Sequence, residues 1–175
     1  MGTSKICLLG ASGYIGREVI KELKKGYKVY APPHAELDVL KPETIKGKLK
    51  GCSLLINLSA GLANKNYAVH TTGTKNIVNE CKKEKIPIIQ ISTTYTETDP
   101  LTEYSKSKFI SEEMVMKSSL PYHIIRLPHV YHSLVRELWY FLTEPYPRPI
   151  NVKRIGKLIR LNINLILSHH RELDK

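Results

Sequence analysis

The chain has 175 residues, of which 42% are apolar and 25% are charged. This composition excludes fibrous, collagen-like and wholly disordered proteins and predicts a single domain over residues 1–175. Lys and Arg number 27 against 16 Asp and Glu, a formal net charge of +11. That charge is compatible with a nucleic-acid or anionic-membrane partner. The lysines are interspersed with glutamates, however, which favours an ordinary solvated surface and also suits a phosphate-bearing ligand.

The three cysteines, Cys7, Cys52 and Cys81, are widely spaced and form no CxxC pair. This spacing argues against a zinc ribbon or a thioredoxin-like site, so we expect reduced thiols in a cytoplasmic protein. The first residues enter a strand and a glycine loop directly, and we therefore expect no signal peptide. No stretch reaches the ~18 apolar residues that a membrane span requires. The best candidate, residues 155–167, is interrupted by two basic residues and two asparagines.

Short apolar runs alternate with helical periodicity over the first 127 residues. The expected strands cover residues 5–9, 27–31, 36–40, 53–58, 87–91 and 122–127. The expected helices cover residues 14–25, 42–50, 66–83 and 101–118. Strands that alternate with helices predict a three-layer, Rossmann-type α/β fold with a doubly wound parallel sheet. Beyond this region we expect a helix over 134–142, a proline-punctuated connection over 144–149 and a final helix over 151–168.

A glycine-rich loop, Gly-Ala-Ser-Gly-Tyr-Ile-Gly at residues 10–16, joins the first expected strand to the first helix. Glycine lets the backbone turn tightly and approach a pyrophosphate. The following helix offers amide groups and a positive dipole end to that anion. The alternative is a glycine turn that only connects the two elements. The placement between a strand and a helix favours dinucleotide binding, although the spacing is GxxGxxG rather than GxGxxG.

The segment after the second expected strand, residues 31–34, reads Ala-Pro-Pro-His and contains no acidic residue. An acid at this place would bind the ribose hydroxyls of NAD. Arg17 and His34 are candidate ligands for a 2′-phosphate instead. We therefore expect NADP or NAD as the cofactor, with a preference for NADP. The alternative for Arg17 is a solvent-facing helix residue.

Taken in chain order, these and later motifs resemble the extended branch of the short-chain dehydrogenase/reductase superfamily, which contains NAD-dependent epimerases, dehydratases and reductases such as dTDP-4-dehydrorhamnose reductase. The glycine loop is similar to that of the branch. The other matching segments are Leu-Asp-Val at 37–39, Ile-Asn-Leu-Ser-Ala-Gly at 56–61, Gly-Thr-Lys-Asn-Ile at 73–77, Ile-Ser-Thr-Thr-Tyr at 91–95, Tyr-Ser-Lys-Ser-Lys at 104–108, and residues 120–131. The resemblance covers roughly residues 5–132 and implies a much reduced substrate domain over 132–175.

The resemblance also implies where a dinucleotide would bind. Its expected ligands come from the glycine loop, an adenine-contacting Asp, the end of the fourth expected strand, the YxxxK helix and the last strand. They are Gly10, Ser12, Gly13, Tyr14, Ile15, Gly16, Arg17, Asp38, Val39, Leu58, Ser59, Ala60, Lys108 and Leu127. In this family the helices corresponding to 66–83 and 101–118 commonly form a dimer interface, so the resemblance implies a homodimer.

Catalytic chemistry can be argued from Tyr104, Lys108 and Thr93. A tyrosine with a pKa near ~10 is a weak acid–base group at neutral pH, but a lysine at i+4 shares its helix face and would lower that pKa. The phenol could then exchange the proton that accompanies hydride transfer at a carbonyl. A hydroxyl at the end of a neighbouring strand would polarise the same oxygen. We assign this role to Thr93, with its neighbours Ser92 and Thr94 as alternatives.

Several residues depart from the family pattern or invite a metal interpretation. The segment from Thr93 to Tyr104 is shorter than usual, and His70 stands where the family helix usually has Asn. We expect no metal site. His129 and His132 have no Cys or carboxylate close by in sequence, and His169, His170, Glu172 and Asp174 are expected to form a solvated tail.

Three classes of function follow from these observations. The first is an NAD(P)-dependent oxidoreductase or epimerase-like enzyme that acts on a small molecule, with a nucleotide-linked sugar as the candidate substrate and Tyr104 as acid/base. The second is a non-catalytic NAD(P)-binding sensor or interaction module, which the small substrate region favours and the intact Tyr104, Lys108 and Thr93 oppose. The third, nucleic-acid binding, rests on charge alone and lacks interleaved aromatic residues. No membrane partner is expected.

Overall fold

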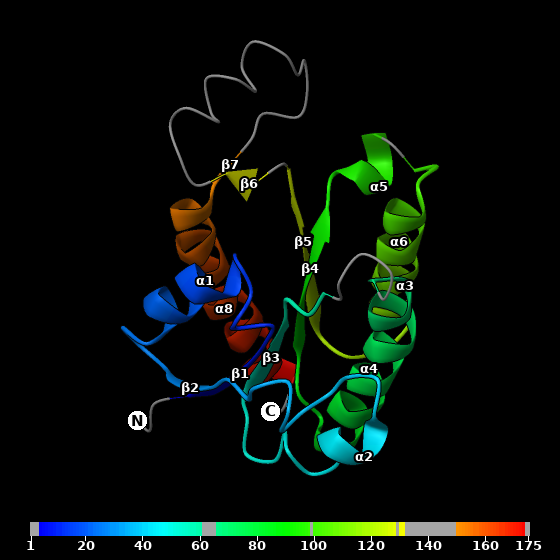
Figure 1. Ribbon diagram of the computed structural model, residues 1–175. Coiled ribbons are helices and arrows are strands. Elements are labelled where there is room, and N and C mark those ends of the chain that lie inside the picture. Colours follow the sequence, from blue (N-terminus) through cyan, green and yellow to red (C-terminus); the bar gives the residue numbers. More distant parts are fainter. Residues whose placement is uncertain (1–3, 61–65, 99, 129, 132–149, 174–175) are drawn as a thin grey trace.

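A central sheet of five parallel strands organises the molecule (Figure 1). The computed structural model describes residues 4–60, 66–98, 100–128, 130–131 and 150–173. The strands are β1 (Lys5–Leu9), β2 (Lys28–Tyr30), β3 (Leu54–Asn57), β4 (Ile88–Thr93) and β5 (Tyr122–Leu127). Their order across the sheet is β2-β1-β3-β4-β5. All four pairings are parallel, so the carboxyl ends of the strands meet at one edge.

Helices cover both faces of this sheet, which confirms the predicted three-layer Rossmann-type fold (Figure 1). One face carries α1 (Gly16–Leu23) and α8 (Val152–Leu173). The other face carries α2 (Pro42–Ile45), α3 (Asn66–Ala68), the π-helical turn η1 (Val69–Gly73), α4 (Thr74–Glu84) and α6 (Glu103–Met116). The short helix α5 (Tyr95–Thr98) follows β4 directly, and β6 (Val130–Tyr131) pairs in parallel with β7 (Ile150–Asn151).

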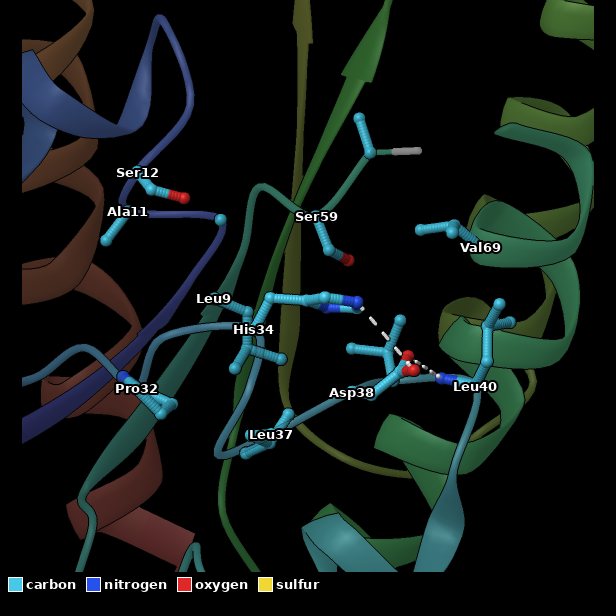
Figure 2. A pocket seen from close by; sticks show the side chains of 13 residues that line it. Leu9, Ala11, Ser12, Pro32, His34, Leu37, Asp38, Leu40, Ser59 and Val69 are labelled. Atoms are coloured by element: carbon cyan, nitrogen blue, oxygen red, sulfur yellow. Dashed lines mark hydrogen bonds and ion pairs between the residues drawn. The ribbon is translucent and has the colours of Figure 1, made fainter. Parts of the chain in front are cut away.

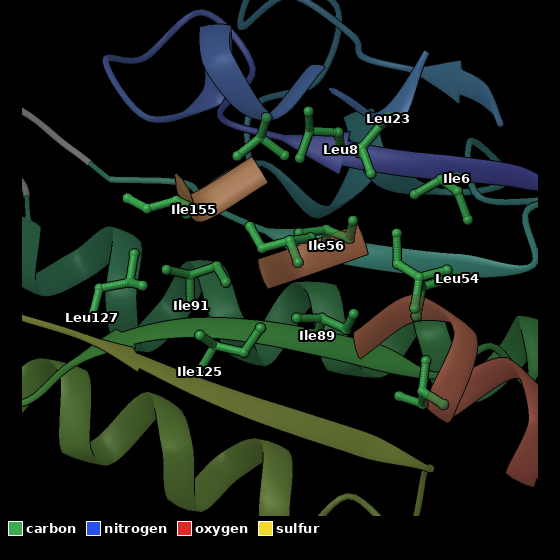
Figure 3. Close-up of a cluster of buried hydrophobic side chains, with 14 of the residues drawn as sticks. Ile6, Leu8, Leu23, Leu54, Ile56, Ile89, Ile91, Ile125, Leu127 and Ile155 are labelled. Carbon is green, nitrogen blue, oxygen red and sulfur yellow. The ribbon is translucent and has the colours of Figure 1, made fainter. Parts of the chain in front are cut away.

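The strands form because they are apolar on both sides, as a parallel sheet covered by two helical layers requires. In β1, Ile6 and Leu8 belong to the core cluster beneath α1 and α8, which Figure 3 shows. Cys7 and Leu9 belong to the cluster on the opposite face. Alternation of side chains along the strand therefore supplies both cores from one short sequence. Cys7, Cys52 and Cys81 are all unpaired and buried in the second cluster.

The final helix α8 completes the first face of the sheet. Its buried residues Ile155, Ile159 and Ile163 recur every four positions and pack into the first core cluster. Arg160 NH1 lies 3.2 Å from Glu22 Oε1 of α1, and the Tyr27 hydroxyl donates to Asn164 Oδ1 at 2.8 Å. The final stretch of the chain is therefore an integral layer of the domain.

The expected third strand, residues 36–40, is wrong: this segment is a turn-rich loop. Its polar groups bond locally instead of pairing with a neighbouring strand. Asp38 Oδ1 accepts from the Leu40 amide at 3.0 Å, and Glu36 accepts from the Tyr30 hydroxyl at 2.8 Å. Local side-chain to backbone bonds of this kind compete with a sheet ladder. Only Leu37 and Val39 are buried, which explains the strand-like alternation of the sequence.

Other boundaries also differ from the sequence-based expectation. The helix expected over 42–50 ends at Ile45, because Gly47 adopts a positive φ of 72° and its amide donates to Glu80 Oε1. The helix expected over 66–83 is interrupted by η1, and α5 was not expected at all. The expected helix 134–142 and connection 144–149 lie outside the described residues.

In the part of the chain that the structure describes, no helix combines the length and the apolar character needed to cross a bilayer.

Candidate functional site

The glycine loop lies between β1 and α1, and at two of its glycines the backbone is packed too closely to admit a side chain. Gly10 has a positive φ of 78°, and a Cβ there would lie 2.5 Å from the Leu58 carbonyl oxygen. A Cβ on Gly16 would lie 2.1 Å from the Gly10 oxygen. A Cβ on Gly13 would meet only the Gly10 oxygen, at 3.2 Å. Gly10 and Gly16 therefore serve close backbone packing, whereas a Cβ on Gly13 would have one close contact, with a carbonyl oxygen of the same loop.

A cleft of about 350 Å³ lies at the carboxyl edge of the sheet beside this loop (Figure 2). One side comes from the glycine loop and the residues after β3, and the other comes from the loop after β2, which supplies apolar residues together with His34 and Asp38. It is lined by Leu9, Gly10, Ala11, Ser12, Pro32, His34, Leu37, Asp38, Val39, Leu40, Ser59, Ala60 and Val69. His34 projects across the cleft in Figure 2, with its Nε2 3.8 Å from Asp38 Oδ2.

The Gly-Thr-Lys-Asn segment at 73–76 holds the apolar side of this cleft in place. A Cβ on Gly73 would lie 2.8 Å from Val39 Cγ2, so only glycine lets the 37–40 loop approach this closely. Asn76 Nδ2 donates to the Val39 carbonyl oxygen at 2.9 Å. On the opposite side, Asn57 Oδ1 accepts from the Ser59 amide at 3.1 Å and thereby fixes the residues after β3.

A second cavity, of about 230 Å³, adjoins the first, and Ala60 lines both. It is formed where β3, β4 and β5 end beneath the start of α6. Its lining residues are Ile15, Leu58, Ala60, Ile91, Ser92, Thr93, Tyr95, Tyr104, Lys108, Leu127, Pro128 and Val130. The structure therefore brings together Tyr104, Lys108 and Thr93, the three residues that the sequence singled out for chemistry.

Helix α6 carries two of these residues and begins at a well-defined cap. The Thr102 side chain accepts from the Ser105 amide at 3.1 Å, which is the usual way to satisfy a free amide of a first turn. Lys108 is buried, and its ammonium group donates to the Ile91 carbonyl oxygen at 3.2 Å. Burial lowers the pKa of Lys108 to about 8, because the charged form is poorly solvated there.

The expected lowering of the Tyr104 pKa by Lys108 is wrong for this arrangement. Tyr104 is only partly buried, with 42% of its surface exposed, and this partial desolvation raises its pKa above the ordinary value; the neighbouring Tyr95 raises it further. The lysine ammonium faces the Ile91 carbonyl oxygen instead. Tyr104 is therefore a protonated phenol at neutral pH, with a hydroxyl available as a proton donor.

The three hydroxyls at the end of β4 differ in their surroundings. Thr93 Oγ1 accepts from the Tyr95 amide at 3.3 Å, so it retains a proton to donate. Ser92 Oγ and Thr94 Oγ1 are buried without a hydrogen-bond partner among the described residues. Both Ser92 and Thr93 line the second cavity, whereas Thr94 is not among its lining residues. Ser92 therefore remains the alternative to Thr93.

The predicted dinucleotide ligands are distributed over both cavities. Gly10, Ser12, Asp38, Val39 and Ser59 line the first cleft, and Ile15, Leu58, Lys108 and Leu127 line the second, with Ala60 shared. Gly13 and Gly16 belong to the loop itself.

Tyr14 and Arg17 line a different hollow, on the outer side of α1, with Glu18, Ile20 and Lys21. Of the two candidate phosphate ligands, His34 and not Arg17 therefore faces the first cleft.

Sequence reasoning missed several apolar residues that line these cavities. Leu37, Leu40 and Val69 complete the first cleft; Leu37 flanks the predicted Asp38, so its position carried a usable signal. Tyr95 completes the second cavity from α5, a helix too short to be recognised by periodicity.

Among the described residues, no three His, Cys, Asp or Glu side chains lie close enough together to hold a metal ion. His129, His132 and Asp174 lie outside the described residues, as do the side chains of His169, His170 and Glu172.

The sequence matches the model of a known family over most of its length. The family is described as the RmlD substrate binding domain, and the match covers residues 4–144. The chain belongs to this family. It is thereby a member of the extended branch of the short-chain dehydrogenases/reductases, as the resemblance of its motifs implied. No curated protein matches the sequence significantly.

Solved structures similar to this RmlD-family chain share its fold at low sequence identity. A dTDP-4-dehydrorhamnose reductase from Bacillus anthracis in complex with NADP superposes with a TM-score of 0.80 at 18% identity, over 95% of this chain and 72% of that one. A dTDP-4-dehydrorhamnose reductase from Clostridium acetobutylicum gives 0.77 at 24% identity, over 93% and 71%. The Bordetella bronchiseptica enzyme WbmH in complex with NAD+ gives 0.71 at 15% identity, over 94% and 73%.

Proposed function

We propose that this protein is an NAD(P)-dependent oxidoreductase that acts on a carbonyl of a nucleotide-linked sugar. The observation that carries the proposal is the convergence of Tyr104, Lys108 and Thr93 on one cavity, which adjoins the cleft beside the glycine loop at Ala60. Membership of the RmlD family and the similarity to dTDP-4-dehydrorhamnose reductases support the substrate class.

The two adjoining cavities suit the two ends of a dinucleotide. The adenosine would lie in the first cleft between Asp38, Val39 and Ser59. The pyrophosphate would lie along the glycine loop, between Ser12, which lines the cleft, and Gly13, which follows it toward the amino end of α1. The nicotinamide would enter the second cavity next to Lys108. Relatives of this fold have been solved with NADP and with NAD+. The absence of an acid at residues 31–34 and the position of His34 in the cleft favour NADP.

The residues of the second cavity suit carbonyl reduction. The bound cofactor would supply the hydride to the carbonyl carbon. Tyr104 would donate its phenolic proton to the carbonyl oxygen, and its raised pKa keeps that proton in place at neutral pH. Thr93 would donate a hydrogen bond to the same oxygen, because its Oγ1 already accepts from the Tyr95 amide. The Lys108 ammonium, once turned from the Ile91 carbonyl toward Tyr104, would stabilise the phenolate that remains.

The experiment is a titration of the purified chain with NADPH and NADH, followed by nicotinamide fluorescence. Micromolar binding is expected for at least one cofactor. Turnover of a dTDP-linked 4-keto sugar is then measured for the wild type and for Tyr104→Phe, which removes the hydroxyl and keeps the ring. We expect the variant to bind the cofactor normally and to lose at least a hundredfold in kcat. Binding without turnover by the wild type would indicate a non-catalytic NAD(P)-binding module, and no binding of either cofactor would contradict both proposals.

We also propose a homodimer that uses the outer surface of α6. Phe109 and Met116 are exposed on this helix, at 46% and 41% of their surfaces, and lie seven residues apart, so they share a helix face. Two copies that join these faces would cover both side chains. Sedimentation of the wild type and of Phe109→Asp distinguishes the states: a dimer that the substitution converts to a monomer supports this interface, and a monomeric wild type contradicts it.

A further inference from the structure

His70 packs against the part of α6 that carries Tyr104 and Lys108. It belongs to the π-helical turn η1 and is 2% exposed. Its ring meets the Tyr104 ring edge to face, with centroids 5.5 Å apart and planes at 70°. Its Nδ1 lies 2.9 Å from Ser107 Oγ, one residue before Lys108. Single π-turns inside helices often occur at functional sites, and this one places an ionisable ring against the proposed proton donor.

The hydrogen-bond chain around His70 fixes the protonation of its ring. Ser107 Oγ donates its only proton to the Tyr104 carbonyl oxygen at 2.8 Å, so toward His70 it can only accept. In this arrangement, which the first test below examines, Nδ1 carries the ring proton. Burial, together with the charge of Lys108, lowers the pKa of His70 to about 3, so the ring is neutral and holds no second proton. Nε2 is consequently a bare hydrogen-bond acceptor.

That acceptor is buried and has no hydrogen-bond partner among the described residues. A buried acceptor without a donor is unfavourable, so a donor close to Nε2 would stabilise the site. Lys108 is a suitable donor. It has three N–H bonds, of which one is given to the Ile91 carbonyl oxygen, and its charge acts on His70.

We propose that His70 is a positioning residue for Tyr104 and Lys108, with its Nε2 serving as an acceptor for the Lys108 ammonium, directly or through one buried water. This inference rests on the proposed function. The neutral imidazole holds the Tyr104 ring in place through their edge-to-face contact. It also stabilises the charged Lys108 side chain when this side chain turns away from the Ile91 carbonyl oxygen. The residue therefore acts on the reaction through the lysine, without touching the substrate.

The other ionisable groups around the pair are compatible with this role. Glu112 lies one turn beyond Lys108 on α6 and raises its pKa. It is itself bound by Arg126 of β5. Tyr95 of α5 acts on Tyr104. His70 is thus the group on the η1 side that responds to Lys108, and replacing it removes an acceptor without changing net charge at neutral pH.

The first test measures the protonation of His70 and the pKa of Lys108 by NMR. It needs no turnover, so its result is informative even if the protein proves not to be an enzyme. Nitrogen-15 NMR of the histidine rings should show His70 as the neutral, Nδ1-protonated tautomer down to pH 5. Carbon-13 NMR of the lysine side chains, recorded with NADPH present and absent, should show a lower Lys108 pKa in His70→Phe than in the wild type. A protonated or Nε2-protonated His70, or an unchanged Lys108 pKa, would overturn the proposal.

The second test uses the reaction. In His70→Phe we expect kcat to fall at least tenfold with little change in KM, and the alkaline limb of the kcat/KM profile to move to lower pH. His70→Asn retains an amide donor and acceptor and should recover much of the loss. An unchanged pH profile, or no rescue by Asn in a folded variant, would reduce His70 to a packing role.

A matched pair of serines controls for packing. Ser107 and Ser111 each donate to the carbonyl oxygen three residues earlier on α6, at 2.8 and 2.7 Å, but only Ser107 also contacts His70. Ser107→Ala should move the alkaline limb in the same direction as His70→Phe, because it frees the ring. Ser111→Ala should leave the pH profile unchanged. Equal shifts in both variants would contradict the proposal.

Discussion

Arg126 of β5 holds the fully buried carboxylate of Glu112 of α6 through three contacts, from Nε at 3.1 and 3.2 Å and from NH2 at 2.6 Å. The same guanidinium reaches Glu97 of α5 at 2.6 Å through NH1. One side chain therefore ties the edge strand of the sheet to the helix that carries Tyr104 and Lys108, and to the short helix that carries Tyr95. This connection fixes the walls of the second cavity relative to one another.

Arg126→Ala should destabilise the protein strongly, because it leaves the Glu112 carboxylate buried and unpaired. Breaking a buried ion pair from one side costs about 3–5 kcal/mol. Glu97→Gln is the matched control: the Glu97 side chain is 61% exposed, and an exposed pair contributes about 1 kcal/mol or less. Urea denaturation of both variants measures the difference. Similar small losses in the two variants would show that Glu112 is not held as described.

The glycine loop predicts opposite results for two of its glycines, Gly13 and Gly16. Gly16→Ala should cost about 1–3 kcal/mol or more, because its Cβ would lie 2.1 Å from the Gly10 oxygen and the backbone must shift. Gly13→Ala should retain stability to within about 1 kcal/mol, since its Cβ meets only one atom, at 3.2 Å. The same methyl group occupies the space beside α1 where we place the pyrophosphate, and it should weaken NADPH binding at least tenfold.

Thermal denaturation and NADPH titration test this pair together. Gly26→Ala serves as the control, because a Cβ there has its nearest neighbour, an Arg160 side-chain atom, at 3.7 Å. It should change neither quantity. If a folded Gly13→Ala protein bound NADPH with full affinity, the proposed position of the pyrophosphate beside Gly13 would be wrong.

The fold was largely predictable because its strands are short, continuous apolar runs separated by helices; β5, for example, spans the expected residues 122–127. The expected strand 36–40 failed because alternating burial of Leu37 and Val39 is the pattern of a strand, while the Asp38 side chain bonds its own loop. Periodicity cannot distinguish the two cases.

The proximity of Tyr104, Lys108 and Thr93 was predictable from the sequence, but their electrostatics was not. Tyr104, Lys108 and Thr93 do line one cavity, since the ends of parallel strands meet at one edge of the sheet. The direction of the Tyr104 pKa was wrong, because helix spacing says that two side chains share a face and not which acceptor the lysine chooses. The role of His70 depends on a hydrogen-bond chain through Ser107, which no spacing rule reveals.

Cofactor preference should depend on His34 and not on Arg17. His34 lines the first cleft, whereas Arg17 lines a separate hollow on α1. His34→Ala should weaken NADPH binding by up to about fivefold, the contribution expected of an exposed polar contact to a phosphate, and leave NADH binding unchanged. Arg17→Ala should alter neither affinity. A loss of NADPH affinity in Arg17→Ala alone would reverse this assignment.

Lys108→Met should stabilise the protein at neutral pH while abolishing turnover. The pKa of Lys108 is lowered from 10.5 to about 8 by burial, and a pKa unit corresponds to about 1.4 kcal/mol. Holding the charged lysine in the folded state at pH 7 therefore costs up to about 3 kcal/mol, which methionine avoids with a side chain of similar length. A stability gain with a loss of function is expected where a site stores an unfavourable charge.

The pH dependence of that gain provides the check. Between pH 8 and 10.5 the unfolded wild type binds a proton at Lys108 that the folded protein has lost, so the stability of the wild type rises with pH across this window. The variant has no such group, and groups common to both proteins cancel in the comparison. Urea denaturation at pH 7, 8, 9 and 10 should therefore show the advantage of Lys108→Met shrinking steadily above pH 8. A difference that stays constant over this range would mean that Lys108 keeps its ordinary pKa in the folded protein.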